Sequence, residues 1–145
     1  MGCRGIIVAG LAIAVGITSE PVSAGSQGRQ GTPSGWILPD DADEKKNPLP
    51  VDDTLIAAGR AVFKDKCTRC HGPGGLGDGP DADPDAVPDM DLTNPKRADR
   101  NPDGIVFYNV WNGRRRPKMP AFSEELNEQQ VWSVVAYVQS LRRKP

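Results

Sequence analysis

Residues 64–75 read KDKCTRCHGPGG and carry the strongest signal in this 145-residue chain. The stretch contains two of the three cysteines, Cys67 and Cys70, and the single histidine, His71. Two residues separate the cysteines, and the histidine follows the second one directly. Reactive sulfur and imidazole groups at this spacing indicate a bound metal or cofactor.

Four interpretations of this cluster compete. In the first, each thiol adds to a vinyl group of a haem and the adjacent imidazole coordinates the iron, which the C-x-x-C-H spacing allows. Zinc needs four ligands, and since the sequence has no second Cys or His pair, carboxylates would have to complete the set. A thiol redox pair belongs at a helix N-terminus after a strand, whereas here a helix precedes the pair. A plain disulfide leaves the position of the histidine unexplained. We therefore predict one covalently attached haem, with Cys67 and Cys70 as its thioether links and His71 as an axial iron ligand.

A second axial ligand is sought among the methionines. Met90 lies in the acidic stretch VPDMDLT, and Met119 lies in RRRPKMPAF, where a proline on each side stiffens the backbone. A thioether in a rigid loop closes the sixth iron position and raises the reduction potential. We predict that Met119 is this ligand. In the alternative, Met119 only packs and the iron is open, as in a haem enzyme or a gas sensor.

Moving outward from the motif, the sequence predicts an all-α fold with no strand alternation. A first helix is expected to start at Asp52 or Asp53 and to run into Cys67. Residues 72–94 are rich in Gly, Pro and Asp, and so predict an irregular loop with at most a short turn. A core this thin would gain stability from a group bound at its centre.

Two further helices are predicted by their end signals. One opens with Asn101 as cap and Pro102 in the first turn, and ends at Gly113. The last opens with a capping box made by Asn127 and Gln130. Its apolar stripe consists of Val131, Val134, Val135, Val138 and Leu141.

The N-terminal region predicts export. Residues 1–24 contain one early positive charge at Arg4, an apolar run and small residues up to Ala24, which is the order of a cleaved signal peptide. The alternative is a retained anchor, but the apolar run is shorter than the roughly 20 residues of a spanning helix. Residues 25–51 are expected to form a flexible leader and an extended strap, and residues 52–145 the folded domain.

Charge along the chain is unevenly distributed. The formal net charge of −1 gives no reason to expect nucleic acid as a partner. Residues 78–91 contain six aspartates and no basic residue, whereas Arg114, Arg115, Arg116 and Lys118 crowd beside Met119. Both runs are by default solvated surface, but the basic run would also steer an acidic partner toward the haem edge.

With these motifs in place, residues 55–141 resemble the class I monohaem c-type cytochromes of bacteria. The resemblance rests on IAAGRAVFKDKCTRCHG, GDGP, KMPAF and the final-helix sequence VVAYVQSL. It implies a small cytochrome c fold of three to four helices, with Gly59 and Tyr137 where the first and last helices cross. It also implies that a loop proline, Pro73 or Pro80, offers its carbonyl to the haem histidine.

The function that follows as an expectation is that of an exported, periplasmic electron carrier, not an enzyme, because both axial iron positions are filled. Its partners would be redox proteins meeting it at small, transient interfaces. The alternative is a cytochrome subunit of a larger periplasmic oxidoreductase.

Overall fold

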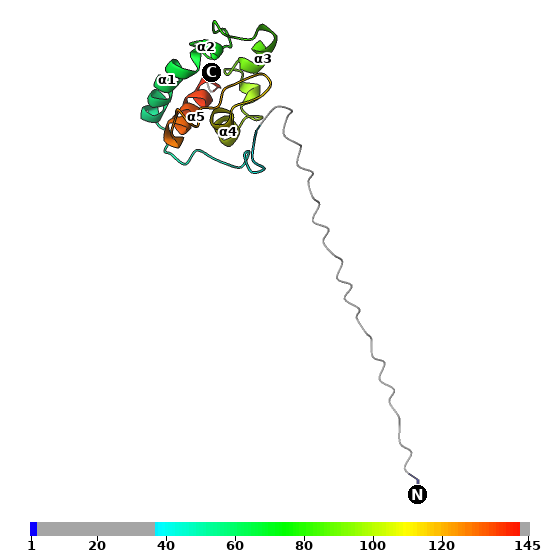
Figure 1. The fold of residues 1–145 in the computed structure, drawn as a ribbon. Helices are drawn as coiled ribbons and strands as arrows, with labels where there is room; N and C mark the ends of the chain where they lie inside the picture. Colours follow the sequence, from blue (N-terminus) through cyan, green and yellow to red (C-terminus); the bar gives the residue numbers. More distant parts are fainter. Residues whose placement is uncertain (3–36, 143–145) are drawn as a thin grey trace. The chain divides into compact units, whose positions relative to one another are not determined.

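The computed structural model describes residues 1–2 and 37–142, and the folded unit lies within 31–145. The expected signal peptide and residues 25–36 of the expected leader fall outside the described residues, apart from Met1 and Gly2. Within 37–142 the chain is helical, with no strand and one isolated two-residue bridge (Figure 1). Its helices are α1 (Asp53–Lys66), α2 (Thr68–His71), α3 (Val87–Met90), α4 (Asp103–Asn112) and α5 (Glu128–Arg142), with 3-10 turns at Pro84–Ala86 and Pro95–Arg97. The all-α prediction is confirmed.

The ends of α1 and α5 follow the expected capping chemistry. Asp52 caps α1 by accepting a hydrogen bond from the Leu55 amide at 2.8 Å. The Asn127 side chain accepts from the Gln130 amide at 2.9 Å, and the Gln130 side chain accepts from the Asn127 amide at 3.0 Å. The reciprocal capping box is therefore confirmed, and it fixes where the last helix starts.

The start of α4 differs from the prediction by one position. Pro102 is itself the N-cap residue, in extended conformation, and α4 begins at Asp103. Asn101 lies outside the helix and its carbonyl accepts from the side chain of Arg142 instead. The end at Gly113 is confirmed, since this residue has a φ of 72° and breaks the helical path.

Helices α1 and α5 lie side by side and cross closely at Gly59 (Figure 1). A Cβ atom at Gly59 would collide with the backbone carbonyl of Ser133, one turn before Tyr137. The Tyr137 ring packs on Phe63 of α1 with centroids 5.1 Å apart. The expected pairing of a small residue with an aromatic at this crossing is confirmed.

The apolar stripe of α5 forms the centre of the core. All five predicted stripe residues are buried, and Val131, Val134 and Val135 are almost completely inaccessible to solvent. Phe107 of α4 stacks on Trp132 with ring centroids 4.3 Å apart. These contacts fix α4 and α5 against each other.

Residues 37–50 run without a helix and are tied to α4 and α5. The Asn47 side chain donates to the Trp132 carbonyl at 3.0 Å, and the Asn47 backbone N–H donates to the Asp103 carboxylate at 3.2 Å. Lys45 donates to the Tyr108 hydroxyl at 3.2 Å and its ammonium lies 4.7 Å from the Phe107 ring centroid. This segment closes the apolar side of the α4–α5 pair.

Candidate functional site

The C-x-x-C-H motif forms a single helical turn that continues from α1. The amide of Cys67 donates to the Phe63 carbonyl, and the amides of Cys70 and His71 both donate to the Cys67 carbonyl. Gly72, with a φ of 72°, ends the turn. Residues three and four positions apart in a helix share one face. The spacing therefore places both sulfurs and the imidazole on one wall of a cavity, which all three residues line.

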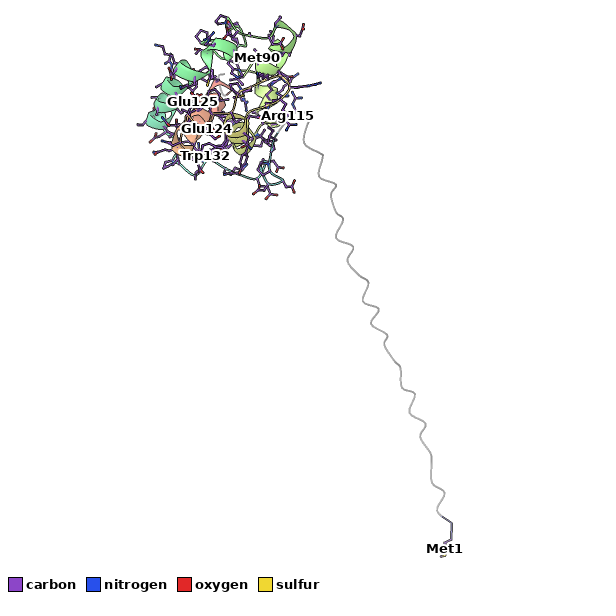
Figure 2. The ribbon with its side chains drawn as sticks, in the orientation of Figure 1. Met1, Met90, Arg115, Glu124, Glu125 and Trp132 are labelled. Carbon is purple, nitrogen blue, oxygen red and sulfur yellow. The ribbon has the colours of Figure 1, made fainter. Side chains whose placement is uncertain are left out.

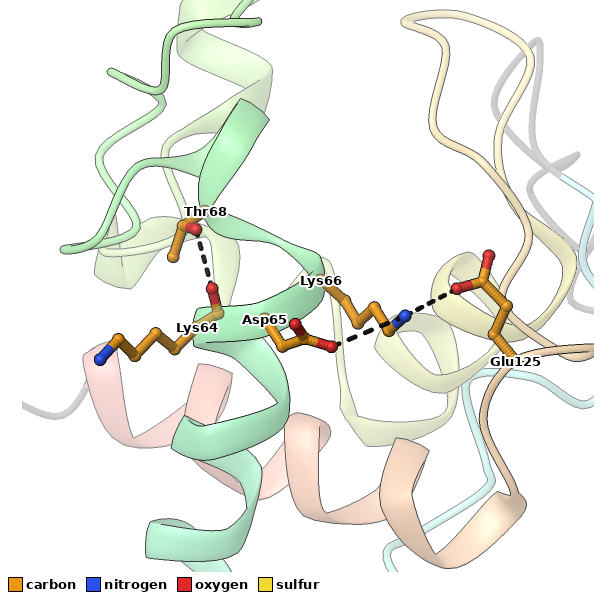
Figure 3. A network of polar contacts seen from close by, with 5 residues as sticks. All are labelled: Lys64, Asp65, Lys66, Thr68 and Glu125. Atoms are coloured by element: carbon orange, nitrogen blue, oxygen red, sulfur yellow. Dashed lines mark hydrogen bonds and ion pairs between the residues drawn. The ribbon is translucent and has the colours of Figure 1, made fainter.

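The entry of this turn is held by polar contacts on the outer surface (Figure 3). The Thr68 hydroxyl donates to the Lys64 carbonyl at 2.9 Å, and the Lys66 ammonium pairs with Glu125 at 2.9 Å. The second contact ties the end of α1 to the segment that precedes α5. It also raises the pKa of Lys66, chiefly through the hydrogen bond to Glu125.

His71 is oriented by one hydrogen bond. Its Nδ1 lies 2.9 Å from the carbonyl oxygen of Met90. Met90 is the last residue of α3 and is labelled in Figure 2. A carbonyl only accepts, so Nδ1 carries the proton and Nε2 has a free lone pair. Burial lowers the pKa of His71; the Met90 bond opposes this effect and the charge of Arg97 adds to it. The imidazole is therefore neutral, as a metal ligand must be.

The prediction that a proline carbonyl orients His71 is wrong. The group that bonds the histidine belongs to Met90, not to Pro73 or Pro80. The physical reason lies in α3, which stops at Met90 because Asp91 is extended. The last carbonyls of a helix have no partner inside it, so this one is available to the imidazole. The sequence prediction missed this short helix because it lies within residues 72–94, whose composition is typical of a loop.

The two cysteines are free thiols in different surroundings. Cys67 is buried and Cys70 is partly exposed. Burial, aided by the neighbouring Cys70 and Asp65, raises the pKa of Cys67 to about 12. Reactive cysteines need a low thiol pKa, so this environment disfavours the thiol-redox interpretation.

Met119 lines the same cavity from a tight loop. Its amide donates to the Arg114 carbonyl at 2.8 Å, and the Arg114 amide donates to the Met119 carbonyl at 2.9 Å. The Phe122 amide then donates to the Val110 carbonyl at 3.0 Å, which returns the chain to α4. The structure thus brings Cys67, Cys70, His71 and Met119 together around one space.

Basic residues outnumber acidic ones on the wall of this cavity, and of these the sequence pointed only to Arg114 and Lys118. Among the described residues that line it, Asp89 supplies the single carboxylate, while the cations are Lys66, Arg97, Arg114, Lys118 and Arg142. Burial lowers the pKa of Arg142, and the charge of Arg97 lowers it further. The Asn109 side-chain oxygen is also buried against this cavity with no hydrogen-bond partner.

These features fit a haem. A neutral imidazole with Nε2 free, two thiols on the same face and apolar walls match a covalently attached ring with an axial histidine. The surplus of positive charge matches the two carboxylates that a haem carries. The fold and the cavity together define a small all-α haem-binding protein.

The comparisons with known proteins agree with this class. Residues 56–142 match the family model "Cytochrome c", so the chain belongs to the cytochrome c family, which carries covalently bound c-type haem and transfers electrons. Among solved structures it is similar to a chain of the reducing HAO-like protein complex of Kuenenia stuttgartiensis, with 29% identity and a TM-score of 0.54. The match covers 65% of this chain and 46% of that one, so this chain spans less than half the length of its structural neighbour. No curated protein matches.

Proposed function

We propose that this protein is an exported c-type cytochrome with one haem, which carries electrons and is not an enzyme. When bound, the haem supplies a one-electron couple between Fe(III) and Fe(II). Cys67 and Cys70 would hold it through thioether links, and His71 and Met119 would be its axial ligands. The observation that carries the proposal is the bond from His71 Nδ1 to the Met90 carbonyl, which leaves Nε2 for the metal.

The same bond favours Met119 over Met90 as the second ligand. Both methionines line the cavity, but the Met90 carbonyl lies at Nδ1 and would therefore be on the side of His71 away from a metal bound at Nε2. Met119 lies on a separate loop whose backbone is closed by the Arg114 pair of hydrogen bonds. A ligand held in this way needs little reorganisation when the iron changes oxidation state.

Two methionine variants test this ligand set. In the holoprotein, Met119→Ala should convert the low-spin absorption spectrum to that of open, five-coordinate iron. Met90→Ala should keep the low-spin spectrum, because the backbone carbonyl that bonds His71 remains. If Met90→Ala opens the iron and Met119→Ala does not, the assignment of the second ligand is wrong.

Export and the number of haems are tested together by mass. The chain expressed in a bacterium with a periplasmic haem-attachment system should be recovered from the periplasm. Its intact mass should equal residues 25–145 plus one haem. Recovery in the cytoplasm, an uncut chain or a second haem would each contradict part of the proposal.

A basic surface beside the cavity is the proposed docking site for redox partners. Arg115, Arg116 and Lys118 are exposed, and Lys118 also lines the cavity. An acidic partner would be steered there at low ionic strength. Replacing Arg115 and Arg116 by Gln should slow electron exchange with such a partner and flatten its salt dependence. Replacing the exposed cations Lys46 and Arg60, which do not line the cavity, should leave the rate unchanged. Equal rates for both double variants would refute the docking site.

One observation favours a second candidate, a subunit of a larger oxidoreductase. The structural neighbour is a chain of a multi-protein complex, and this chain spans only 46% of it. In the part of the chain that the structure describes, no helix has the length and apolar character to cross a membrane. Isolation of the tagged protein from its native source distinguishes the candidates. Stable co-purification with one oxidoreductase supports the subunit, and recovery as a single chain supports the free carrier.

A further inference from the structure

Two arginines hold the short segment that contains the Met90 carbonyl. Arg97 donates from Nη1 to the Asp89 carbonyl at 2.8 Å and from Nη2 to the Asp89 carboxylate at 2.7 Å. Arg142 donates from Nε to the Leu92 carbonyl at 3.3 Å. The first contact is one residue before Met90 and the second is two residues after it. The group that bonds His71 is therefore held on both sides along the chain.

The two guanidinium groups are shielded from water and anchored. The Arg97 side chain is 13% exposed and Arg142 is 6% exposed. Arg142 also donates from Nη1 to the Asn101 carbonyl at 2.9 Å and to the Gln139 side chain at 3.1 Å. The two bonds from Arg97 to Asp89 have the length of strong charge-assisted hydrogen bonds, and the forked guanidinium adds directional control.

The arrangement is electrostatically expensive. The charge of Arg97 lowers the pKa of both His71 and Arg142, next to the burial of each group. Both arginines line the cavity, where Asp89 is the single carboxylate among the described lining residues. The ion pair between Arg97 and Asp89, 2.7 Å long, offsets part of this repulsion.

We propose that Arg97 and Arg142 are positioning residues for the iron ligand His71. By fixing residues 89–92 they fix the Met90 carbonyl, and so the Nδ1 hydrogen bond and the direction of Nε2. A hydrogen bond from the far nitrogen of a ligating histidine sets its orientation and its basicity. The inference rests on the proposed role of His71 as an axial ligand and adds the residues that hold it in place.

In an alternative interpretation, these arginines act only as positive charges that attract the haem carboxylates. Arg97→Lys separates the two roles, because it keeps the charge and removes the fork that grips Asp89. Arg97→Gln removes both. Asp81→Asn is the matched control, since it breaks the exposed Arg69–Asp81 pair, also 2.7 Å long, which joins α2 to the following loop and does not involve Met90.

The readout is the hydrogen-exchange rate of the His71 Nδ1 proton, measured by NMR in the reduced, full-chain holoprotein. We expect exchange at least about tenfold faster in both Arg97→Lys and Arg97→Gln, which corresponds to about 1.4 kcal/mol of lost protection. We expect the same direction in Arg142→Lys. Asp81→Asn should exchange at the wild-type rate.

Two results would overturn the proposal: wild-type exchange in Arg97→Lys, whether or not the Gln variant exchanges faster, or equally fast exchange in Asp81→Asn. Faster exchange in the Gln variant alone would assign the arginines to the haem carboxylates. If Arg142→Lys fails to fold, Arg97→Lys decides alone. The proposed function is tested separately: it fails if the absorption spectrum of the wild-type holoprotein shows no low-spin iron. The positioning role is tested by the ratio of the variant to the wild-type exchange rate of the Nδ1 proton.

Discussion

Replacing Gly59 by Ala sets two physical effects against each other at the α1–α5 crossing. In the middle of an exposed helix this change would stabilise the protein by about 1 kcal/mol, because Ala is the better helix former. At Gly59 the added methyl group would collide with the Ser133 carbonyl and lie 3.0 Å from the Tyr137 Cβ. A backbone carbonyl cannot rotate away as a flexible side chain can.

The magnitude follows from this rigidity. Inserting a methyl group into a packed interface costs about 1–3 kcal/mol, and more where the obstacle is backbone. Because the obstacle here is backbone, the cost lies at the upper end of this range, and subtracting the gain in helix propensity leaves an expected net loss of about 2 kcal/mol in the free energy of unfolding. This is a large part of the 5–15 kcal/mol that typically stabilises a domain. Because Phe63 and Cys67 follow on the same helix, separation of α1 from α5 would also widen the cavity.

Urea unfolding of the oxidised holoprotein, followed by far-ultraviolet circular dichroism, measures the effect. With a slope typical of small proteins, the midpoint should fall by about 1 M. The control is Ala58→Gly, one residue away and exposed, which should cost only the propensity difference of about 1 kcal/mol. A Gly59→Ala variant as stable as the wild type or more so would refute the close crossing.

Two further predictions concern the scaffold around the site. Asn127→Ala removes the capping box at the start of α5 and should cost about 1 kcal/mol in urea unfolding, whereas Gln129→Ala, exposed on the same first turn, should cost a few tenths; equal losses would contradict the cap. Lys45→Met removes the Tyr108 hydrogen bond and the position over the Phe107 ring, and should cost about 1 kcal/mol. The control Lys46→Met changes an exposed neighbouring residue and should alter stability little. A larger loss of stability in Lys46→Met than in Lys45→Met would contradict the contacts described for residues 37–50.

The parts of the site that the sequence predicted are those set by local spacing. Two residues between Cys67 and Cys70, followed at once by His71, place three groups on one helical face whatever the rest of the chain does. The capping box of α5 is likewise a contact over three residues. Gly59 was assigned through the family resemblance, and the structure supplies its reason in the Ser133 carbonyl.

The parts that the sequence did not predict depend on contacts between distant segments. The Met90 carbonyl is 19 residues from His71, and backbone groups leave no residue-specific signal. Arg142 is 6% exposed and contacts Leu92 and Asn101, which lie 50 and 41 residues away along the chain. Arg97 had no distinguishing pattern at all. Arg142 follows Val138 by four residues and so continues the predicted apolar stripe of α5, which is a signal that could have pointed to its burial.

An optical redox titration of the full-chain holoprotein, with and without carbon monoxide, tests most directly whether the protein carries electrons. The axial pair His71 and Met119 predicts low-spin spectra in both oxidation states, a reversible one-electron midpoint and no change when carbon monoxide is added to the reduced protein. A five-coordinate oxidised spectrum, or binding of carbon monoxide by the reduced protein, would contradict the electron-carrier proposal and favour an open-site haem enzyme or gas sensor.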